Sequence, residues 1–338
     1  MKAQLLDHRL ALGLILVLCM IAAPVSAYVP LTVSFSDGEA VIAHWRDSSF
    51  PVSVVASEGL SPDIGGGSDV EALQSALNTW SSVDGSTARL RYGGEGDVQA
   101  GVIDGINALE FSTSPELDLS GAITQSFLLI DDDGVIREAD ILVNNRRYTF
   151  NTDGGNVGLD LETALLRELG HLLGLDSSPI GEMTFTGGQQ KVEDDSAVMF
   201  PVPRGPTQVA RELAEDDKAA VAAVYSDGTS RGSISGRITT QSGLPVFGAH
   251  VVVFEPVDQV LVGAVTLPDG SYTVGGLPPG RYVMRVEPLK PPADASSLGG
   301  IFSTMSDLVN SSFRPAFLER YVDVVAGTEA GGVNLEVQ

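Results

Sequence analysis

The stretch LLRELGHLLGLDSS, from Leu165 to Ser178, belongs to a predicted helix that ends in a sharp turn. Apolar residues recur along residues 161–173 at helical spacing, and Asp160 stands where a helix N-cap is expected. Gly174 follows the last of these apolar residues, and glycine commonly ends a helix in a left-handed conformation. The predicted helix carries Arg167, Glu168 and His171 near its centre.

Composition indicates a globular chain of two domains. Its 338 residues are 43% hydrophobic and 19% charged, so the chain can build a core and is not of the disordered class. The 44 acidic residues outnumber the 20 basic ones and give a formal net charge of -24. Because such a surface repels phosphate backbones, we expect no nucleic-acid partner. Calcium or a cationic ligand would suit this charge, and so would a role in solubility alone.

Residues 1–27 have the pattern of a secretory signal peptide. A basic start precedes an apolar run from Leu10 to Ile21, and residues 25–27 form a small-residue cleavage site. The run is too short to span a bilayer well, and no later segment reaches about 18 apolar residues, so we expect no stable membrane anchor. Cys19, the only cysteine, lies within this segment, which leaves the mature chain without disulfides. We therefore expect a secreted protein, in the bacterial periplasm or outside the cell.

The rest of the chain divides into an α+β part and an all-β part. Helices are predicted over residues 68–83, 161–173 and 210–225, with strands between them. SDGTSRG, residues 226–232, has the composition of a linker. Beyond it, apolar and polar residues alternate between Gly, Pro and Asp turns, as in a small antiparallel sandwich. We set the domains at residues 28–228 and 229–338, and expect a protease to cut the linker and release two folded pieces.

Residues 28 to about 228 resemble the matrixin family of metzincin zinc endopeptidases. Seven segments match that family in order: the strand with Trp45, the helix ending in Trp80, DGIN, GVIREADILVN, LRELGHLLGLDSS, SAVMFP and EDDKAAVAAVY. The resemblance implies an α+β domain with a mixed twisted sheet and three main helices. Residues 233–338 resemble the transthyretin-like sandwich of carboxypeptidase regulatory-like domains, through GRITTQSGLPVFGAHV and DGSYTVGGLPPGRY.

The zinc motif that the matrixin resemblance implies, H-E-x-x-H-x-x-G-x-x-H, is broken at two of its three ligands. His171 is the sole retained ligand position, Arg167 stands at the first position and Ser177 at the third. An arginine is always protonated and offers no lone pair. Its charge about 4 Å from a zinc ion would cost roughly 8 kcal/mol at an effective dielectric constant of about 20. The family uses zinc, but we expect this chain to lack it.

Three further residues could serve either a zinc site or the packing of the fold. Glu168 stands at the general-base position, but without a metal-bound water it has little to activate, and Arg167 or another cation would neutralise it. Met199 in SAVMFP matches the family's Met-turn, and it would serve core packing if zinc is absent. Recruitment of His44 as a replacement ligand is less favoured than a surface or packing role.

The acidic stretch DDDG allows either a calcium site or a hairpin turn. It begins at Asp131, and the side chains that could bind calcium are those of Asp131, Asp132 and Asp133. The stretch lies just before the strand that matches the family's structural cation region.

Three functions remain open at this point. The favoured one is a secreted pseudoprotease that keeps its cleft and binds a peptide or protein ligand without hydrolysing it. The first alternative is an active zinc metalloendopeptidase with an unusual ligand set. The second is a structural or adhesive surface protein whose sandwich makes the contacts. The oligomeric state stays open in all three.

Overall fold

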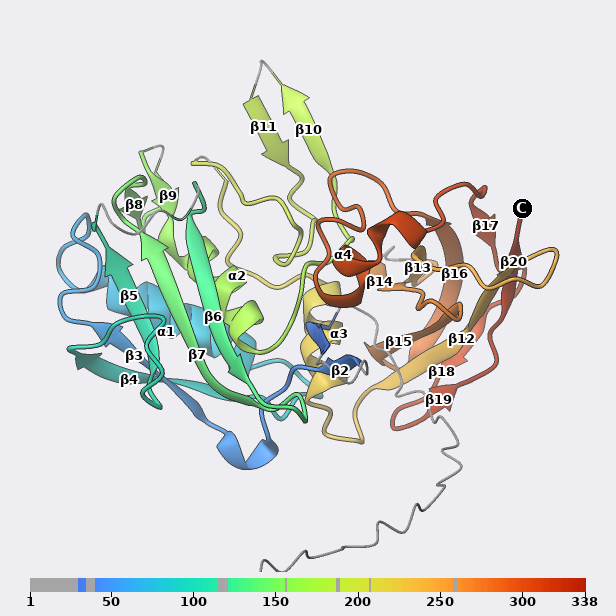
Figure 1. Cartoon of the computed structure of the whole chain (residues 1–338), viewed down its shortest axis with the longest axis horizontal. Coiled ribbons are helices and arrows are strands. Elements are labelled where there is room, and N and C mark those ends of the chain that lie inside the picture. The colour runs from blue at the N-terminus through green and yellow to red at the C-terminus, as the bar shows by residue number, and fades with distance from the viewer. Residues whose placement is uncertain are drawn as a thin grey trace, which may run out of the picture.

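The computed structural model describes residues 30–338 except 35–39, 115–118, 120, 156, 187–188, 207 and 258–260. The predicted signal peptide, residues 1–27, lies outside the described residues. Within the described ranges, no helix is long and apolar enough to cross a membrane. The chain forms a mixed α+β part followed by a β-rich part, as expected, and the two parts lie beside each other (Figure 1). We call them the first part (up to residue 228) and the second part (from residue 229).

A five-stranded sheet with the order β4-β3-β5-β7-β6 forms the centre of the first part. Its strands are β3 (Val52–Ser57), β4 (Leu90–Gly96), β5 (Asn107–Ser112), β6 (Thr124–Ile130) and β7 (Ile136–Asn144). Four of these strands pair in parallel, and β6 pairs antiparallel with β7 at the edge of the sheet. β7 is buried along almost its whole length because it lies between β5 and β6, whereas β6 is mostly half-buried. Within the described residues, the other edge of β6 pairs with no strand of this sheet.

Three helices accompany this sheet: α1 (Ser68–Ser81), α2 (Leu161–Leu172) and α3 (Glu215–Val224). α1 and α2 lie side by side on the sheet (Figure 1). Both tryptophans of the chain donate hydrogen bonds to backbone carbonyls of α2. Trp80 donates from Nε1 to the carbonyl of Leu166 at 2.7 Å, and Trp45 donates to that of Leu172 at 2.8 Å. Because both indoles are buried, these hydrogen bonds fix α2 within the core.

The second part is a β-sandwich built from two sheets. One has the order β15-β12-β19 with β20 beside β12, and the other has the order β14-β13-β16-β17 with β18 beside β16. Apolar side chains on the facing sides of these sheets form one buried core. The strands are β12 (Gly232–Thr240), β13 (Ala249–Phe254), β14 (Leu261–Val265), β15 (Ser271–Leu277), β16 (Gly280–Pro288), β17 (Ala316–Phe317), β18 (Val322–Val324), β19 (Glu329–Ala330) and β20 (Leu335–Val337).

Short elements complete the chain. Between β16 and β17 lie α4 (Gly300–Thr304) and the 3-10 helix η2 (Ser306–Leu308). The others are β1 (Thr32–Ser34), β2 (Ala40–Ile42), the 3-10 helix η1 (Asp47–Ser49), β8 (Phe150–Asn151), β9 (Leu159–Asp160), β10 (Met183–Thr186) and β11 (Gln189–Val192). The β10–β11 hairpin projects from the body of the molecule (Figure 1).

The helix predicted over residues 210–225 is shorter in the structure, where α3 begins at Glu215. Arg211 lies outside the helix and forms an ion pair with Asp160 at the start of α2. Asp217 then stops the helix from extending backwards, because its side chain accepts a hydrogen bond from the N–H of Ala214, the N-cap residue. Tertiary contacts thus outweigh the helical propensity of residues 210–214.

The two parts share a buried interface. Ala219 of α3 belongs to the core of the second part, and a Cβ placed on Gly276 would lie only 2.0 Å from its carbonyl oxygen. A second contact joins Ile180 and Ala197 of the first part to Val252 of β13. The backbone of residues 226–231 is therefore one of several connections between the parts.

The sequence led us to expect that a cut in this linker releases two pieces, but the interface changes this expectation. The two parts should stay associated, because the apolar contacts persist after the chain is broken. Residues 226–229 are exposed and accessible to a protease. Limited subtilisin digestion should give two fragments on a denaturing gel that elute together, at the size of the intact chain, on native gel filtration. Elution as two separate species in native buffer would show that the interface is weak, and urea provides the control for separated fragments.

Candidate functional site

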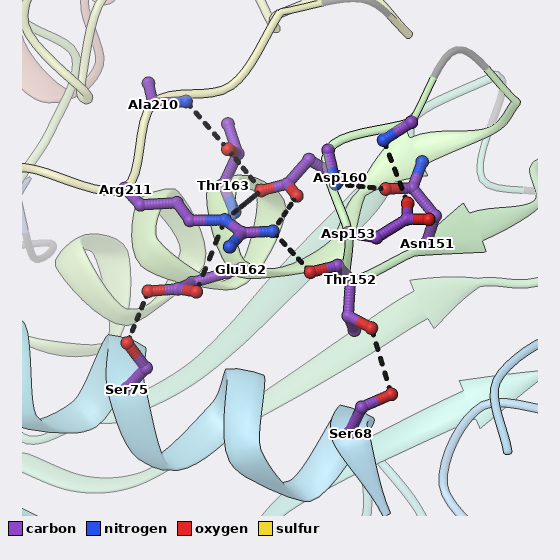
Figure 2. A network of polar contacts seen from close by, with 12 residues as sticks. Ser68, Ser75, Asn151, Thr152, Asp153, Asp160, Glu162, Thr163, Ala210 and Arg211 are labelled. Carbon is purple, nitrogen blue, oxygen red and sulfur yellow. Dashed lines mark hydrogen bonds and ion pairs between the residues drawn. The ribbon is translucent and has the colours of Figure 1, made fainter. Parts of the chain in front are cut away.

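A polar network fixes the beginning of α2 (Figure 2). Asp160 caps the helix by accepting a hydrogen bond from the N–H of Thr163 at 3.0 Å, and Arg211 pairs with the same carboxylate at 2.5 Å. Arg211 also donates to the carbonyl of Thr152 and lies 3.3 Å from Glu162. Burial alone would raise the pKa of Asp160, but the hydrogen bonds from Arg211 and Thr163 outweigh it and hold that pKa below its usual value. The network ties the start of α2 to the segment before α3.

Arg167 projects from α2 toward the turn that contains Met199. Its Nη1 donates to the carbonyl of Phe200 at 2.5 Å and lies 3.3 Å from that of Val198. Burial lowers the pKa of Arg167, and nearby carboxylates oppose this effect. The guanidinium stays charged because its ordinary pKa is far above neutrality. A cation held by two carbonyls therefore stands at the first ligand position.

Glu168 is buried and held by hydroxyl groups of the edge strand β6. Thr124 donates to one carboxylate oxygen at 2.7 Å, and Ser126 donates to the other at 2.6 Å. Among the described residues, no cation forms an ion pair with Glu168 within 4.0 Å. We expected a cation to neutralise Glu168. In the structure, two hydroxyl groups hold its carboxylate instead.

His171 lies one helical turn beyond Arg167 and is half-buried. Its Nδ1 is 2.9 Å from the carbonyl of Leu175. Because a carbonyl oxygen only accepts hydrogen bonds, Nδ1 is the donor in this contact and Nε2 is left out of it. Gly174 then reverses the chain with a φ of 80°, and a Cβ there would lie 2.4 Å from the carbonyl oxygen of Ala43. Only glycine fits this close approach.

Ser177 and Asp176 follow this turn, and both are buried. The N–H of Ser177 donates to Asp176 Oδ1 at 2.6 Å. The other oxygen, Oδ2, faces the second part, since a Cβ placed on Gly299 would lie 2.1 Å from it. Burial raises the pKa of Asp176, against the opposing effects of the Ser177 N–H and of His171. Asp176 thus contributes to the contact between the two parts.

These residues do not fit a catalytic zinc ion. Such an ion needs about three neutral or anionic protein ligands, but Arg167 is a cation and Ser177 offers only a hydroxyl. Across the part of the chain that the structure describes, no group of three or more His, Cys, Asp or Glu side chains could hold a metal. His44 does not complete the set either, and its Nδ1 lies 3.0 Å from the carbonyl of Ile42.

The turn around Met199 is held by Asp217. This fully buried carboxylate accepts hydrogen bonds from the N–H groups of Val198, Met199 and Ala214, at 2.8, 3.1 and 2.9 Å. The side chain of Met199 packs beneath α2, since a Cβ placed on Gly170 would lie 2.4 Å from its sulfur. Asp217 therefore positions the same turn whose carbonyls bind Arg167.

The neighbouring carboxylate, Asp216, connects this site to the second part. One oxygen accepts from the hydroxyl of Ser178 at 2.5 Å, and the other accepts from the N–H of Gly263 in β14 at 2.8 Å. Burial raises the pKa of Asp216 to about 7 and that of Asp217 to about 6. From the sequence, EDDKAAVAAVY is a predicted helix and one of the segments that resemble the matrixin family, and no role is predicted for Asp216 or Asp217. The sequence feature that could have indicated this role is the pair of adjacent aspartates in the first turn of the helix, a turn that the structure buries.

A narrow cavity of about 40 Å³ lies beside Arg167. Its walls come from α2, from the start of β6 and from residues 197–210, and they include Thr124, Ala164 and Val202. A space of this size exceeds the roughly 10–15 Å³ that one water molecule needs. It could therefore hold a small apolar side chain. The sequence did not reveal this cavity because its walls come from three separate segments.

The DDDG turn is organised around Asp131. One carboxylate oxygen accepts from the N–H groups of Asp133 and Val135 at 3.1 and 2.8 Å, and the other pairs with Arg137 at 2.5 Å. Asp132 and Asp133 are exposed. This arrangement favours the hairpin turn, since Arg137 already neutralises the central carboxylate. Calcium binding remains a prediction.

Comparison with known proteins bears on the second part. Residues 233–292 match the family of carboxypeptidase regulatory-like domains, which confirms that resemblance for this segment. A solved structure, the Bacillus anthracis TIE protein, is 19% identical over 32% of this chain and 16% of that chain, with a TM-score of 0.20. This chain thus spans a small share of that protein, and the likeness is too low to support a conclusion. The comparison with curated proteins finds no match.

The two buried aspartates should respond differently to replacement by asparagine. In Asp216→Asn, the amide oxygen can accept from Gly263 and the amide NH₂ can donate to the hydroxyl of Ser178, so the contacts survive. In Asp217→Asn, an NH₂ group would face backbone N–H donors. That mismatch should lower the free energy of unfolding by about 1–3 kcal/mol.

The pH dependence provides the measurement. The folded-state pKa of Asp216, about 7, lies above its unfolded value near 4. The folded protein therefore binds a proton that the unfolded chain has lost, and stability should fall as pH rises between these values. Urea unfolding at pH 4.5, 6 and 8 should show a flatter slope for Asp216→Asn than for the unmodified protein. An unchanged slope in that variant would contradict this assignment.

Proposed function

We propose that residues 28–228 form a matrixin-like domain that binds a peptide segment without hydrolysing it. The observation that carries this proposal is the guanidinium of Arg167, which replaces the first metal ligand and is bound by the carbonyls of Val198 and Phe200. The mixed sheet with its antiparallel edge strand, the three helices and the turn under α2 support the matrixin resemblance.

Loss of hydrolysis follows from the chemistry of these residues. A zinc peptidase uses its metal to lower the pKa of a bound water to about 7, and a carboxylate then accepts the proton. Here a fixed positive charge stands at a ligand position. Both oxygens of Glu168 already accept hydrogen bonds, one from Thr124 and one from Ser126, so the carboxylate is held in place by β6.

Peptide binding is supported by the edge strand and the cavity beside it. β6 pairs with β7 on one side, and its other edge can accept an extended peptide as an additional strand. Thr124, the first residue of β6, also lines the 40 Å³ cavity next to Arg167. An extended peptide on β6 could therefore place a small apolar side chain in this cavity.

A second candidate function is adhesion through the β-sandwich, the part of the chain in which residues 233–292 match a carboxypeptidase regulatory-like domain. We also propose that the protein is secreted, on the basis of the signal-peptide pattern in residues 1–27. An active zinc endopeptidase would need ligands other than those assembled around His171.

Filling the cavity should weaken peptide binding. The mature protein is titrated into a fluorescein-labelled mixture of casein fragments, and anisotropy reports binding. Ala164→Phe should weaken binding about tenfold or more because its ring occupies the cavity, whereas Ala164→Ser keeps the space and should bind normally. No fragment should be cleaved.

Two outcomes would refute this proposal. Absence of peptide binding by the unmodified protein would remove the binding function. Cleavage that a chelator stops, and that Glu168→Ala abolishes, would instead establish an active metalloendopeptidase.

Restoring the ligands should restore metal binding. Arg167→His together with Ser177→His rebuilds H-E-x-x-H-x-x-G-x-x-H on a helix and turn that are already in place. The double variant should bind zinc at about one equivalent and gain thermal stability with the metal. Each single variant should bind far less, because one lacks a third ligand and the other keeps the guanidinium. Calorimetric zinc titration of all four proteins tests this, and equally tight binding by the unmodified protein would show that other residues supply the ligands.

A further inference from the structure

A second cavity, of about 320 Å³, lies between the two parts of the chain, away from Arg167. One wall consists of residues 179–183 and Asp195 from the first part, and the other consists of β13, the end of β16 and residues 288–293 from the second. Four prolines and several aliphatic side chains line it together with charged groups, and polar atoms make up somewhat more of its lining than apolar atoms do. Cavities of about this size that lie between domains are frequent small-molecule sites, and a polar lining suits a charged ligand.

The wall from the second part is positively charged. Arg285 lies 3.1 Å from one oxygen of Glu287, and Lys290 lies 3.0 Å from the other. Two cations thus share a single carboxylate. The buried Nε of Arg285 has no hydrogen-bond acceptor among the residues that the structure describes. Burial lowers the pKa of His250 on the same wall to about 4, so its imidazole is neutral. This wall therefore has an excess positive charge.

The wall from the first part is negatively charged. Glu182 and Asp195 both line the cavity, and both are exposed. Within the described ranges, neither carboxylate has a cationic side chain within 4.0 Å. Unpaired carboxylates thus face cations that are only partly neutralised, across a space large enough for a ligand.

We propose that this inter-domain cavity binds a small zwitterion of amino-acid or dipeptide size. The ligand's carboxylate would bind Arg285 and Lys290, and its ammonium group would lie toward Glu182 and Asp195. Planar guanidinium groups suit carboxylates because they donate in parallel, and Lys290 adds a mobile point charge.

The neutral part of such a ligand would contact the prolines and aliphatic residues between the charged walls. These proline rings have little conformational freedom, so ordering them on binding costs little entropy. Since the cavity is formed by both parts, a bound ligand would also hold the two parts together. This site is independent of the peptide-binding role proposed for β6.

Calorimetry on the full mature chain tests the proposal. The probes are leucine and alanyl-leucine, together with alanyl-leucine whose amine is acetylated or whose carboxylate is amidated. At least one of the two unblocked probes should bind. Each blocked dipeptide should bind about tenfold more weakly than the free one, because each lacks one charged contact.

Single substitutions on opposite walls provide the second measurement. Lys290→Gln and Glu182→Gln should each weaken binding about fivefold or more, and both side chains are exposed enough for the protein to fold normally. Lys191→Gln and Glu336→Gln remove the same charges from exposed positions outside the cavity and should leave binding unchanged.

Three results would overturn the proposal. These are absence of binding by both unblocked probes, equal binding of the free and blocked dipeptides, and unchanged binding in Lys290→Gln and Glu182→Gln. Stabilisation of the folded protein against heat by the unblocked probes, but not by the blocked ones, would support it independently.

Discussion

Two adjacent buried carboxylates, Asp216 and Asp217, connect the segments on which the candidate site depends. Asp217 accepts hydrogen bonds from two N–H groups of the Met199 turn and from that of Ala214 at the start of α3. Asp216 joins Ser178 to Gly263 in the second part. Burying an acid is costly unless its polar atoms are paired, and the raised pKa values of both residues reflect that cost. Their hydrogen bonds offset the cost of burial. They also connect the first turn of α3 to the Met199 turn, to Ser178 and to β14.

The Met199 turn links this constraint to the chemistry of α2. Because Asp217 sets the path of the turn, the carbonyls of Val198 and Phe200 are available to accept hydrogen bonds from Arg167. Glu168 is meanwhile held by β6 on the other side. The helix can thus keep the geometry expected of a metal site while its residues make structural hydrogen bonds. In the matrixin-like domain proposed above, these hydrogen bonds would support α2 without a metal ion.

The two cavities differ in the parts of the molecule that form them. The cavity beside Arg167 belongs to the first part, and its size suits one side chain of a bound peptide. The inter-domain cavity is larger and lined by charges of both signs. Its cationic wall is notable in a chain with a formal net charge of -24, because basic groups are scarce in this chain. The second part therefore supplies one wall of a cavity that it shares with the first part, which a separate appended module would not do.

Local patterns in the sequence determined the main elements. Apolar spacing, the Asp160 cap and Gly174 predicted α2, and the structure has this helix over Leu161–Leu172. Alternating residues between Gly, Pro and Asp turns likewise predicted the β-rich second part. These signals succeed because helix caps, glycine turns and strand alternation depend on residues that are close in the chain.

Only the tertiary structure decided the partners of the site residues. Glu168 accepts hydrogen bonds from two hydroxyl groups of β6, more than forty residues earlier in the chain. Asp216 accepts one from the N–H of Gly263, 47 residues later. Both cavities are likewise lined by segments distant in sequence. The shortened α3 has the same origin, since Arg211 pairs with Asp160 instead of continuing a helix. Such contacts depend on how whole elements pack, and hydrophobic periodicity carries no information about which polar groups will meet.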